Sequence, residues 1–311
     1  MAVVPGGKCV FKFEAKQVVY DVGGVKIGGD ASKNPTVMIG SIFYKGDKSV
    51  KDEETGVFDK ERMLQTISKM EETSERTGLP AMLDVICTNA ENAAAYLEFA
   101  ADATDMPLLI DAVSEEAAIK GMECAKELGI IDRTVLNSLT PDTKEPVYRK
   151  IKETGLETAI ILTYSARAII SSSERIKILE TLVPKAQTWG IKKPLIDTVV
   201  MDIATLGLAC KAIREVKNRF GYPAGCGAHN AISSWRALKQ KKNKILTLVC
   251  SAIANGLPVT LGADFVLFGP AKEAEWMFPA ISIINAAYGQ VSIEEGVRPS
   301  PSHPRFKISR L

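Results

Sequence analysis

Six polar side chains recur toward the carboxyl ends of successive apolar runs, and their types define the chemistry that is available. The intervals between them are about 26 to 34 residues, as expected of repeating strand–helix–strand units. A carboxylate accepts two parallel hydrogen bonds, and a carboxamide offers one donor and one acceptor edge. Asp and Asn also cap helices and form turns, but six in register favour a shared site. The residues are Asp84, Asp111, Asn137, Thr163, Asp197 and Asn230.

These residue types suit a planar ligand that carries a fork of N–H donors beside ring acceptors. A pterin has this pattern, because its 2-amino and N3–H groups require an acid and its carbonyl and ring nitrogens require an amide. Glycoside hydrolysis, with Asp111 and Asp197 as acid and base, is the paired-carboxylate alternative. It is disfavoured because only 6% of the residues are aromatic, which leaves few side chains to stack on sugars.

Other chemistries lack the residues that they need. The chain has two histidines, His229 and His303, so a three-histidine zinc site is excluded, and a mixed site would require Cys226 and a carboxylate. No predicted strand ends in lysine, which disfavours a Schiff base. GxSxG and P-loop sequences are absent, and the G-x-G at Gly225–Gly227 lacks the third glycine of a dinucleotide site. We therefore predict that the chain binds no metal directly.

The elements that position these residues alternate between short apolar runs and helix-length amphipathic segments. In the helical segments apolar residues recur three or four apart, as in Met63, Ile67 and Met70. Eight alternating units without a break in composition predict an α/β fold, a (β/α)8 TIM barrel, with the strand ends at one mouth. The predicted strands are Thr36–Phe43, Ala81–Cys87, Pro107–Val113, Thr134–Leu139, Thr158–Tyr164, Pro194–Val200, Pro223–His229 and Phe265–Gly269.

The two ends of the chain are predicted to lie outside the barrel, although residues 1–311 form one predicted domain. Residues 290–311 contain three prolines and are expected to form an irregular tail on the surface. Residues 1–30 are expected to contain an N-terminal β-hairpin that turns at Gly23–Gly24 and caps the bottom of the barrel. Its strand-like runs are Val10–Phe13, Val18–Val22 and Val25–Ile27.

Composition excludes several classes of protein. The 39 Lys and Arg residues nearly balance the 37 Asp and Glu residues, so the net charge of +2 gives no broad field for nucleic acid or an anionic membrane. The uncharged stretch Ile245–Ala263 has the length of a membrane span, but its Asn, Gly and Pro residues predict a buried helix, a turn and the approach to a strand. Six cysteines without a CxxC pair indicate reduced thiols, and the first residues contain no secretory signal. We expect a cytoplasmic protein.

Several separated motifs, in order, carry a resemblance to a known group of methyltransferases. They are DVGGVKIGGD…PTVMIGSIFYKGDK, GVFDKE, PLLIDAV…TVLNSLT, GAHNAISSW and GADFVLFGP, and the similarity extends from about Phe11 to Gly289. The chain resembles the H subunit of tetrahydromethanopterin S-methyltransferase. It resembles still more the methylcorrinoid:tetrahydrofolate methyltransferases of glycine betaine and methylamine catabolism. A pterin-binding barrel is the fold that this resemblance implies. Dihydropteroate synthase, another member of the wider group, would require a phosphate site of Lys and Arg, and VLFGPAKEAE offers only Lys272.

The resemblance implies roles for five residues. Asp111 in PLLIDAV and Asp197 in PLIDTVV match pterin-binding acids, and Asn137 in TVLNSL matches an amide that binds the pterin. Asn230 in GAHNAIS matches the asparagine near N5, where an amide can stabilise developing charge without titrating. Capping of the seventh helix is the other possible role of Asn230. Asp84 is a less specific match to the pterin site.

The implied reaction moves a methyl group between the cobalt of a methylcorrinoid and N5 of tetrahydrofolate, giving 5-methyltetrahydrofolate and cob(I)amide. The chain has no DxHxxG cobalamin motif, so the corrinoid is expected on a separate corrinoid protein that docks transiently at the barrel mouth. The resemblance also implies a homodimer. The alternative is an H-type subunit of a membrane-bound tetrahydromethanopterin S-methyltransferase complex, because the two pterins share the head group that the strand ends would contact.

Overall fold

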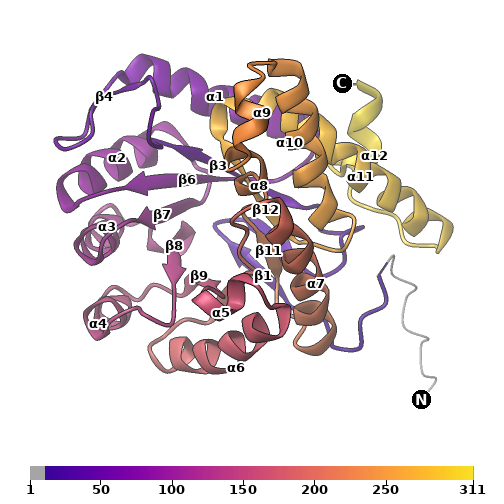
Figure 1. Ribbon diagram of the computed structural model, residues 1–311, viewed down its shortest axis with the longest axis horizontal. Helices are drawn as coiled ribbons and strands as arrows, with labels where there is room; N and C mark the ends of the chain where they lie inside the picture. Colours follow the sequence, from indigo (N-terminus) through magenta and orange to yellow (C-terminus); the bar gives the residue numbers. More distant parts are fainter. Residues whose placement is uncertain (1–10, 311) are drawn as a thin grey trace.

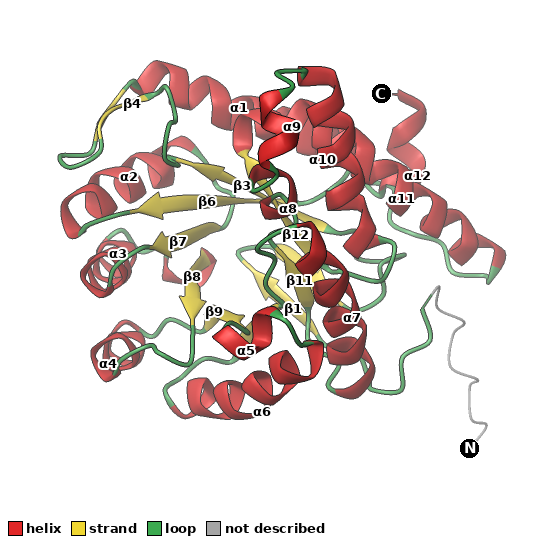
Figure 2. Ribbon diagram, in the orientation of Figure 1, coloured by secondary structure: helices red, strands yellow, loops and turns green. Residues whose placement is uncertain are grey.

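The computed structural model describes residues 11–310, and its centre is a closed barrel of eight parallel strands (Figure 2). The strands follow one another around the barrel in sequence order, and every neighbouring pair is parallel. The predicted (β/α)8 barrel is therefore confirmed. The strands are β3 (Val37–Ile42), β6 (Ala81–Cys87), β7 (Leu108–Ala112), β8 (Thr134–Leu139), β9 (Thr158–Leu162), β10 (Lys193–Asp197), β11 (Ala224–Cys226) and β12 (Phe265–Pro270).

Helices cover the outside of the barrel and carry the chain from one strand to the next (Figure 1). Helix α1 shows the local causes: the Asp59 side chain accepts a backbone N–H at its start, and Gly78, with a φ of 75°, ends it. Its predicted apolar stripe is fully buried against the strands. The helices are α1 (Lys60–Thr77), α2 (Ala90–Ala103), α3 (Glu115–Glu127), α4 (Glu145–Thr154), α5 (Ala166–Ile169), α6 (Ser172–Thr188), α7 (Ile203–Arg219), α8 (Asn230–Ser233), α9 (Arg236–Gln240), α10 (Lys244–Val259) and α11 (Ala274–Glu294).

Apolar side chains pack in two layers, one between the strands and helices and one inside the barrel. The inner layer includes fully buried residues from the amino-terminal parts of the strands, such as Val37, Leu109, Ile160 and Phe265. Because this layer fills the amino-terminal half of the interior, the carboxyl-terminal half is left for polar side chains.

A short hairpin closes the amino-terminal end of the barrel, as predicted. Strands β1 (Val19–Val22) and β2 (Val25–Gly28) pair antiparallel, and Val22 and Ile27 are buried in the inner apolar layer. The turn between them consists of two glycines with φ of 54° and 87°. A two-residue hairpin turn of type I′ requires positive φ at both positions, which explains the Gly-Gly pair.

Two features around the hairpin differ from the sequence analysis. Of the predicted run Val10–Phe13, Val10 lies outside the described residues, and residues 11–13 form no strand, because Phe11 packs on Phe13 and Tyr288 through its ring. A second hairpin, β4 (Val50–Asp52) with β5 (Val57–Phe58), lies between β3 and α1 and was not predicted.

The carboxyl-terminal tail is more regular than expected. After an irregular stretch, α12 (Pro304–Lys307) and the 3-10 turn η3 (Ile308–Arg310) follow, and α12 packs against α11. His303 is buried, and its Nδ1 accepts the backbone N–H of Arg305 at 3.1 Å. The prediction of an irregular tail is wrong for residues 304–310, because a proline in the first helical turn and a capping histidine start a helix there.

The uncharged stretch Ile245–Ala263 forms α10 and the turn that leads to β12, but the helix is not fully buried. Four residues spaced four apart form an exposed apolar face, which we call the α10 stripe; the exposed fractions range from 41% to 75%. Within residues 11–310, no helix is both long enough and apolar enough to cross a membrane. The α10 stripe consists of Ile245, Val249, Ile253 and Leu257.

Candidate functional site

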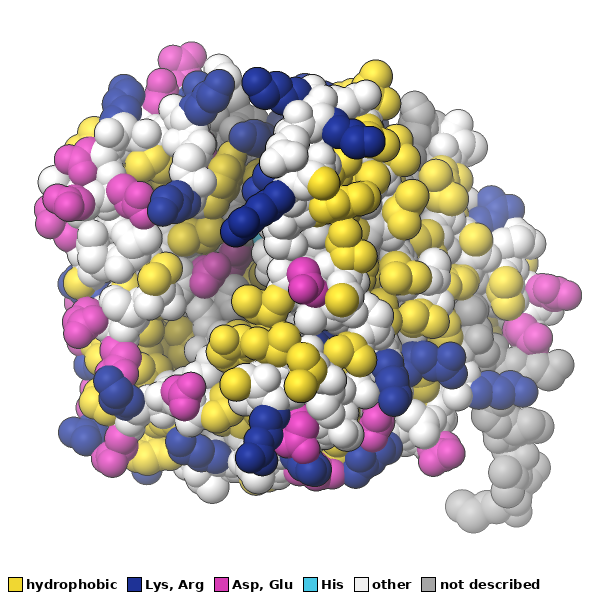
Figure 3. Space-filling view, in the orientation of Figure 1, with side chains coloured by type: hydrophobic (Ala, Val, Ile, Leu, Met, Phe, Trp, Pro, Cys, Tyr) yellow, Lys and Arg dark blue, Asp and Glu magenta, His cyan; other side chains and the backbone are white. Residues whose placement is uncertain are grey.

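The carboxyl-terminal ends of the strands surround a cavity of about 430 Å³ that all five predicted site residues line. Figure 3 shows this face of the molecule hollowed, with acidic side chains inside the hollow. The sixth residue of the polar series, Thr163, does not line the cavity; its Oγ1 donates to the carbonyl oxygen of Asp197 at 3.0 Å. The five lining residues are Asp84, Asp111, Asn137, Asp197 and Asn230.

Asp84 connects two side chains of the cavity wall. Its Oδ2 accepts the hydroxyl of Ser41 at 2.8 Å, and its Oδ1 accepts the amide Nδ2 of Asn137 at 3.1 Å. Burial raises the pKa of Asp84 to about 6, although both hydrogen bonds act in the opposite direction. Because Nδ2 of Asn137 is directed to Asp84, the amide oxygen of Asn137 is the edge available to a ligand. Ser41 was not found from the sequence, since a lone serine in an apolar run carries no distinguishing signal.

Asp197 is held by the backbone immediately after it. Its Oδ1 accepts the N–H of Val199 at 2.7 Å, and Val199 has a φ of 52°. Positive φ is rare for a β-branched residue, so the backbone is strained at Val199. This strained conformation directs the Val199 N–H toward the carboxylate of Asp197. Burial raises the pKa of Asp197 to about 6, while that hydrogen bond and the charge of Arg175 oppose the rise.

Arg175 of α6 is a buried cation behind this wall that the sequence analysis missed. Its guanidinium donates to the carbonyl oxygens of Ala168, Ile169 and Thr198 at 2.7 to 3.2 Å. These contacts satisfy the charge with backbone oxygens and place it near Asp197. The sequence of an amphipathic helix does not distinguish a buried arginine of this kind from an arginine on the surface, so Arg175 was not found.

Asp111 differs from the other two carboxylates because none of the described residues hydrogen-bonds to its side chain. Its pKa is raised well above the usual range, mainly by burial and further by the neighbouring charges of Asp84 and Asp197. Three carboxylates around one cavity repel one another, so a ligand that brings N–H donors lowers the energy of their ionised forms.

Asn230 is the first residue of α8 and does not occupy its N-cap position, so the alternative capping role considered from the sequence is wrong. The residue at the N-cap position is His229, and the side chain of His229 makes no capping hydrogen bond. The amide of Asn230 lies over Gly227, where a Cβ would come within 3.2 Å of its Nδ2. Its side chain is therefore free to serve the cavity that it lines.

His229 also lines the cavity, although sequence analysis left it without a role. Its Nδ1 is 2.9 Å from the carbonyl oxygen of Leu267 on β12. Burial lowers the pKa of His229, so the imidazole is neutral near pH 7. Cys226, the other residue left without a role, is buried in the outer apolar layer, does not line the cavity, and has a pKa raised by burial. The described residues contain no cluster of His, Cys, Asp and Glu suited to a metal ion.

A family model described as the tetrahydromethanopterin S-methyltransferase MtrH subunit matches residues 15–300 of the chain. The match extends over nearly all of the described residues and includes every strand of the barrel. The chain belongs to this methyltransferase family.

Curated members of the MtrH family align with the chain from end to end. The H subunit of tetrahydromethanopterin S-methyltransferase from Methanothermobacter thermautotrophicus is 35% identical, over 96% of this chain and 100% of the relative. The protein of the same name from Methanocaldococcus jannaschii is 34% identical over 96% and 100% of the two chains. The H subunit of a putative methyltransferase, mtx, from Methanosarcina mazei is 29% identical over 95% and 98%.

Solved structures similar to this MtrH-family chain include dihydropteroate synthases. The enzyme from Yersinia pestis, in a complex with a sulfonamide drug, matches with a TM-score of 0.61 over 88% of this chain and 100% of that chain, at 13% identity. The enzyme from Stenotrophomonas maltophilia matches with a TM-score of 0.60 over 86% and 97%, at 17% identity. At these identities the likeness concerns the fold, and it agrees with the barrel described above.

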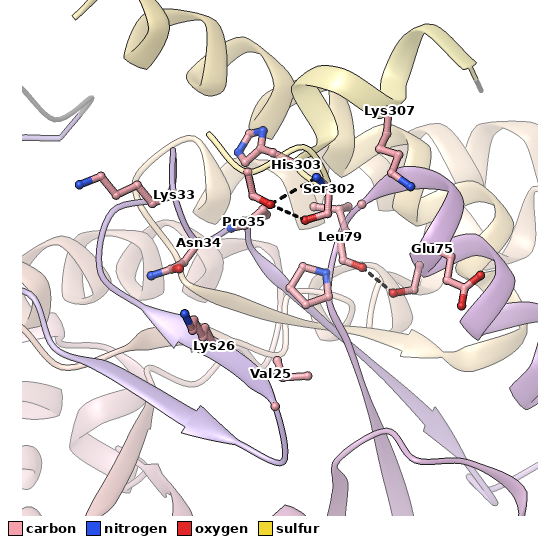
Figure 4. Close-up of a pocket in the computed structure, with 15 residues that line it drawn as sticks. Val25, Lys26, Lys33, Asn34, Pro35, Glu75, Leu79, Ser302, His303 and Lys307 are labelled. Atoms are coloured by element: carbon pink, nitrogen blue, oxygen red, sulfur yellow. Dashed lines mark hydrogen bonds between the residues drawn. The ribbon is translucent and has the colours of Figure 1, made fainter. Parts of the chain in front are cut away.

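A larger cavity of about 580 Å³ lies at the opposite end of the barrel, beside the hairpin, α1 and the tail (Figure 4). Its polar lining includes Lys26, Lys33 and Lys307 together with serine hydroxyls, and Leu79 contributes a backbone carbonyl that accepts from Ser74. This lining has no buried carboxylate. Volume therefore does not identify the active site. The side-chain chemistry does, because the mouth cavity contains the clustered carboxylates, and we take it as the candidate active site.

Proposed function

We propose that this MtrH-family chain transfers a methyl group between a methylcorrinoid, carried by a separate protein, and N5 of tetrahydrofolate. The proposal depends on one observation above all: three carboxylates and two carboxamides line a single cavity at the strand ends. Membership in a methyltransferase family gives the class of reaction. The choice of tetrahydrofolate over tetrahydromethanopterin derives from the sequence resemblance.

The carboxylates are proposed to bind the N–H fork of the pterin. Asp111 and Asp197 would accept the 2-amino and N3–H groups, and the free oxygen edge of Asn137 would accept a further N–H donor. Asp111 has no protein donor among the described residues, and burial, with the charges of Asp84 and Asp197, raises its pKa. Pterin donors would supply the missing hydrogen bonds and return the carboxyl to its ionised form.

Asn230 is proposed to lie against N5. Methyl transfer to N5 leaves positive charge on that nitrogen until its proton departs, and an amide oxygen stabilises such charge. The amide can rotate between its donor and acceptor edges without changing its protonation state, so it serves both directions of the reaction. The position of Asn230 in the wall of the cavity, together with its lack of a capping role, supports this assignment.

The corrinoid is proposed to arrive on a partner that docks at the mouth of the barrel. The mouth cavity holds about 430 Å³, which suits a pterin head group and leaves a corrin ring outside it. Cobalt must approach N5 in line with the bond that breaks, so the partner has to cover the mouth and then leave. A transient interface of modest area meets this requirement.

A homodimer is also proposed, with the α10 stripe in its interface. The adjoining helix α11 adds exposed Trp276 and Ile283, and Figure 3 shows apolar side chains gathered over these helices. Contiguous apolar surface of this kind is usually covered by a partner. We propose a second copy of the chain as the occupant of this surface. We expect the protein to have the mass of a dimer in light scattering and Ile253→Lys to be monomeric; a monomeric unsubstituted protein would contradict this.

The alternative function, an H-type subunit of a membrane-bound complex, is favoured by the names of several relatives that are 34–35% identical. In that case the pterin is tetrahydromethanopterin and the isolated chain lacks its partners. The cavity residues would contact the same pterin head group, so the two functions differ in the tail of the pterin and in the partners.

An anaerobic absorbance assay distinguishes these functions. Purified protein is mixed with cob(I)alamin and either 5-methyltetrahydrofolate or 5-methyltetrahydromethanopterin, and formation of methylcob(III)alamin is followed. Protein-dependent conversion with the folate is the expected result. Conversion with the methanopterin derivative alone would support the alternative, and no conversion combined with no calorimetric binding of either pterin would refute both.

A further inference from the structure

The imidazole of His229 occupies a slot between two glycines, next to the amide of Asn230. A Cβ on Gly269, which has a φ of 101°, would lie 3.3 Å from Cβ and Cγ of His229. A Cβ on Gly227 would lie 3.7 Å from Cε1 of His229 and 3.2 Å from Nδ2 of Asn230. The ring and the amide therefore lie close to the same point above Gly227, on the wall of the mouth cavity.

The surroundings of the ring determine its tautomer. The carbonyl oxygen of Leu267 can only accept a hydrogen bond, so Nδ1 of His229, at 2.9 Å, carries the hydrogen. In the neutral imidazole the lone pair then belongs to Nε2. None of the described residues hydrogen-bonds to Nε2, and the side chain borders the cavity. The wall of the cavity thus contains a hydrogen-bond acceptor that has no partner among the described residues.

We propose that Nε2 of His229 is the base that accepts the proton leaving N5 when the methyl group is transferred. This inference rests on the function proposed above. The lone pair of N5 forms a bond to the methyl carbon, and the carbon–cobalt bond breaks with both electrons remaining on cobalt as cob(I)amide. N5 then carries a methyl group, a hydrogen and a positive charge. The N5–H bond breaks, its electrons stay on nitrogen, and the proton moves to Nε2 of His229.

Other ionisable groups of the cavity wall are less suited to this step. Asp84 already accepts from Ser41 and Asn137, and Asp197 accepts from Val199, while Asp111 faces the proposed N–H fork. Asn230 does not titrate. Tyr164 also lines the cavity, but its side chain is 36% exposed.

The direction of the pH dependence follows from the groups around the ring. The charged groups around the ring come from three places. The carboxylates Asp84, Asp111 and Asp197 line the same cavity, and the turn after β12 contains Lys272 and Glu273. Helices α7 and α10 contact α8, and Asp202 and Lys244 lie at their first turns. None of these charges contributes to the lowered pKa of His229, which results from burial against the opposing hydrogen bond to Leu267. Methylation of N5 therefore slows as pH falls through that pKa, which lies below 6.5, and the reverse transfer accelerates.

Two substitutions test the proposal while keeping the slot filled. His229→Asn retains an amide N–H near the position of Nδ1 for Leu267 but has no atom at Nε2, and His229→Gln places a polar group that does not titrate near Nε2. His303→Asn is the matched control, because His303 lies at the opposite end of the barrel and an asparagine can still cap the helix that follows it. We expect both His229 variants to lose about 100-fold in turnover, within the range for removal of a general base, with pterin affinity changed less than about threefold. We also expect them to lose the acidic limb of the pH profile, whereas His303→Asn keeps the wild-type turnover and profile.

Failure of this inference is distinct from failure of the proposed function. If wild-type protein transfers the methyl group and both His229 variants keep wild-type turnover and pH profile, the function stands and the role of His229 is refuted. If wild-type protein transfers no methyl group to either pterin, the function and this role fall together. An independent measurement is 15N NMR of histidine-labelled protein, which should report hydrogen on Nδ1; hydrogen on Nε2 at pH 7 would overturn the proposal.

Discussion

Replacement of Asp197 by asparagine should raise the free energy of unfolding and lower the affinity for pterins. Burial raises the pKa of Asp197 from 3.8 to about 6, so the ionised carboxylate is disfavoured in the folded state. At about 1.4 kcal/mol per pH unit, the difference corresponds to about 3 kcal/mol of folding free energy. Asparagine is neutral and can still accept the N–H of Val199 through its amide oxygen, so it avoids this cost.

The sign of the effect depends on pH. A carboxyl group with a raised folded-state pKa contributes most stability below its unfolded pKa, and that contribution is lost as pH rises through about 6. Urea unfolding of both proteins should therefore give nearly equal free energies near pH 3, below the unfolded pKa of 3.8. At pH 7.5, Asp197→Asn should be more stable by up to about 3 kcal/mol.

Binding should change in the opposite direction. The amide NH2 of asparagine would face pterin N–H donors, and a lost hydrogen bond to a charged group costs about 1.5–3 kcal/mol, or roughly 10- to 150-fold in affinity. Calorimetry with tetrahydrofolate measures this change. Asp202→Asn is the matched control, because it removes one charge from an exposed helix cap and keeps an amide oxygen for Thr205. A less stable Asp197→Asn protein at pH 7.5, or a stability difference that is constant from pH 4 to 8, would refute the reasoning.

Three further substitutions test other parts of the account. Asn230→Ala should lower turnover in the methyl-transfer assay at least tenfold while pterin affinity stays nearly constant, and an affinity loss with unchanged turnover would contradict the role at N5. Gly227→Ala places a Cβ 3.2 Å from Nδ2 of Asn230 and should lower turnover severalfold with little change in thermal stability; wild-type kinetics would show that the amide is not confined there. Lys217→Met leaves the buried carboxylate of Asp264 without its ion-pair partner and should lower the free energy of unfolding in urea by about 3–5 kcal/mol. A loss below about 1 kcal/mol would mean that water reaches the pair.

The barrel was predictable because its signals are local and repeated. Each strand is a short apolar run, and Asp111, Asn137 and Asp197 mark strand ends at regular intervals. Parallel pairing in sequence order then brings those ends to one mouth without any knowledge of individual contacts. The two-glycine turn of the amino-terminal hairpin was readable for a similar reason, since few residues other than glycine adopt positive φ at both positions.

Features that depend on long-range packing were not predictable. Arg175 and Ser41 act on the site only because α6 and β3 pack against particular strands, and neither has a distinctive sequence context. His229 gains its tautomer from Leu267, 38 residues further along the chain. The helix after His303 has local starting signals, a proline and a capping histidine, but its packing against α11 is a contact that local composition does not reveal.

A crystal structure of the protein with bound 5-methyltetrahydrofolate tests the central claim most directly. The account predicts that the pterin lies in the mouth cavity, with its N–H fork on Asp111 and Asp197 and with N5 within hydrogen-bond reach of Asn230. A pterin found in the lysine-lined cavity beside the hairpin, or one in the mouth with N5 directed away from Asn230, would contradict it.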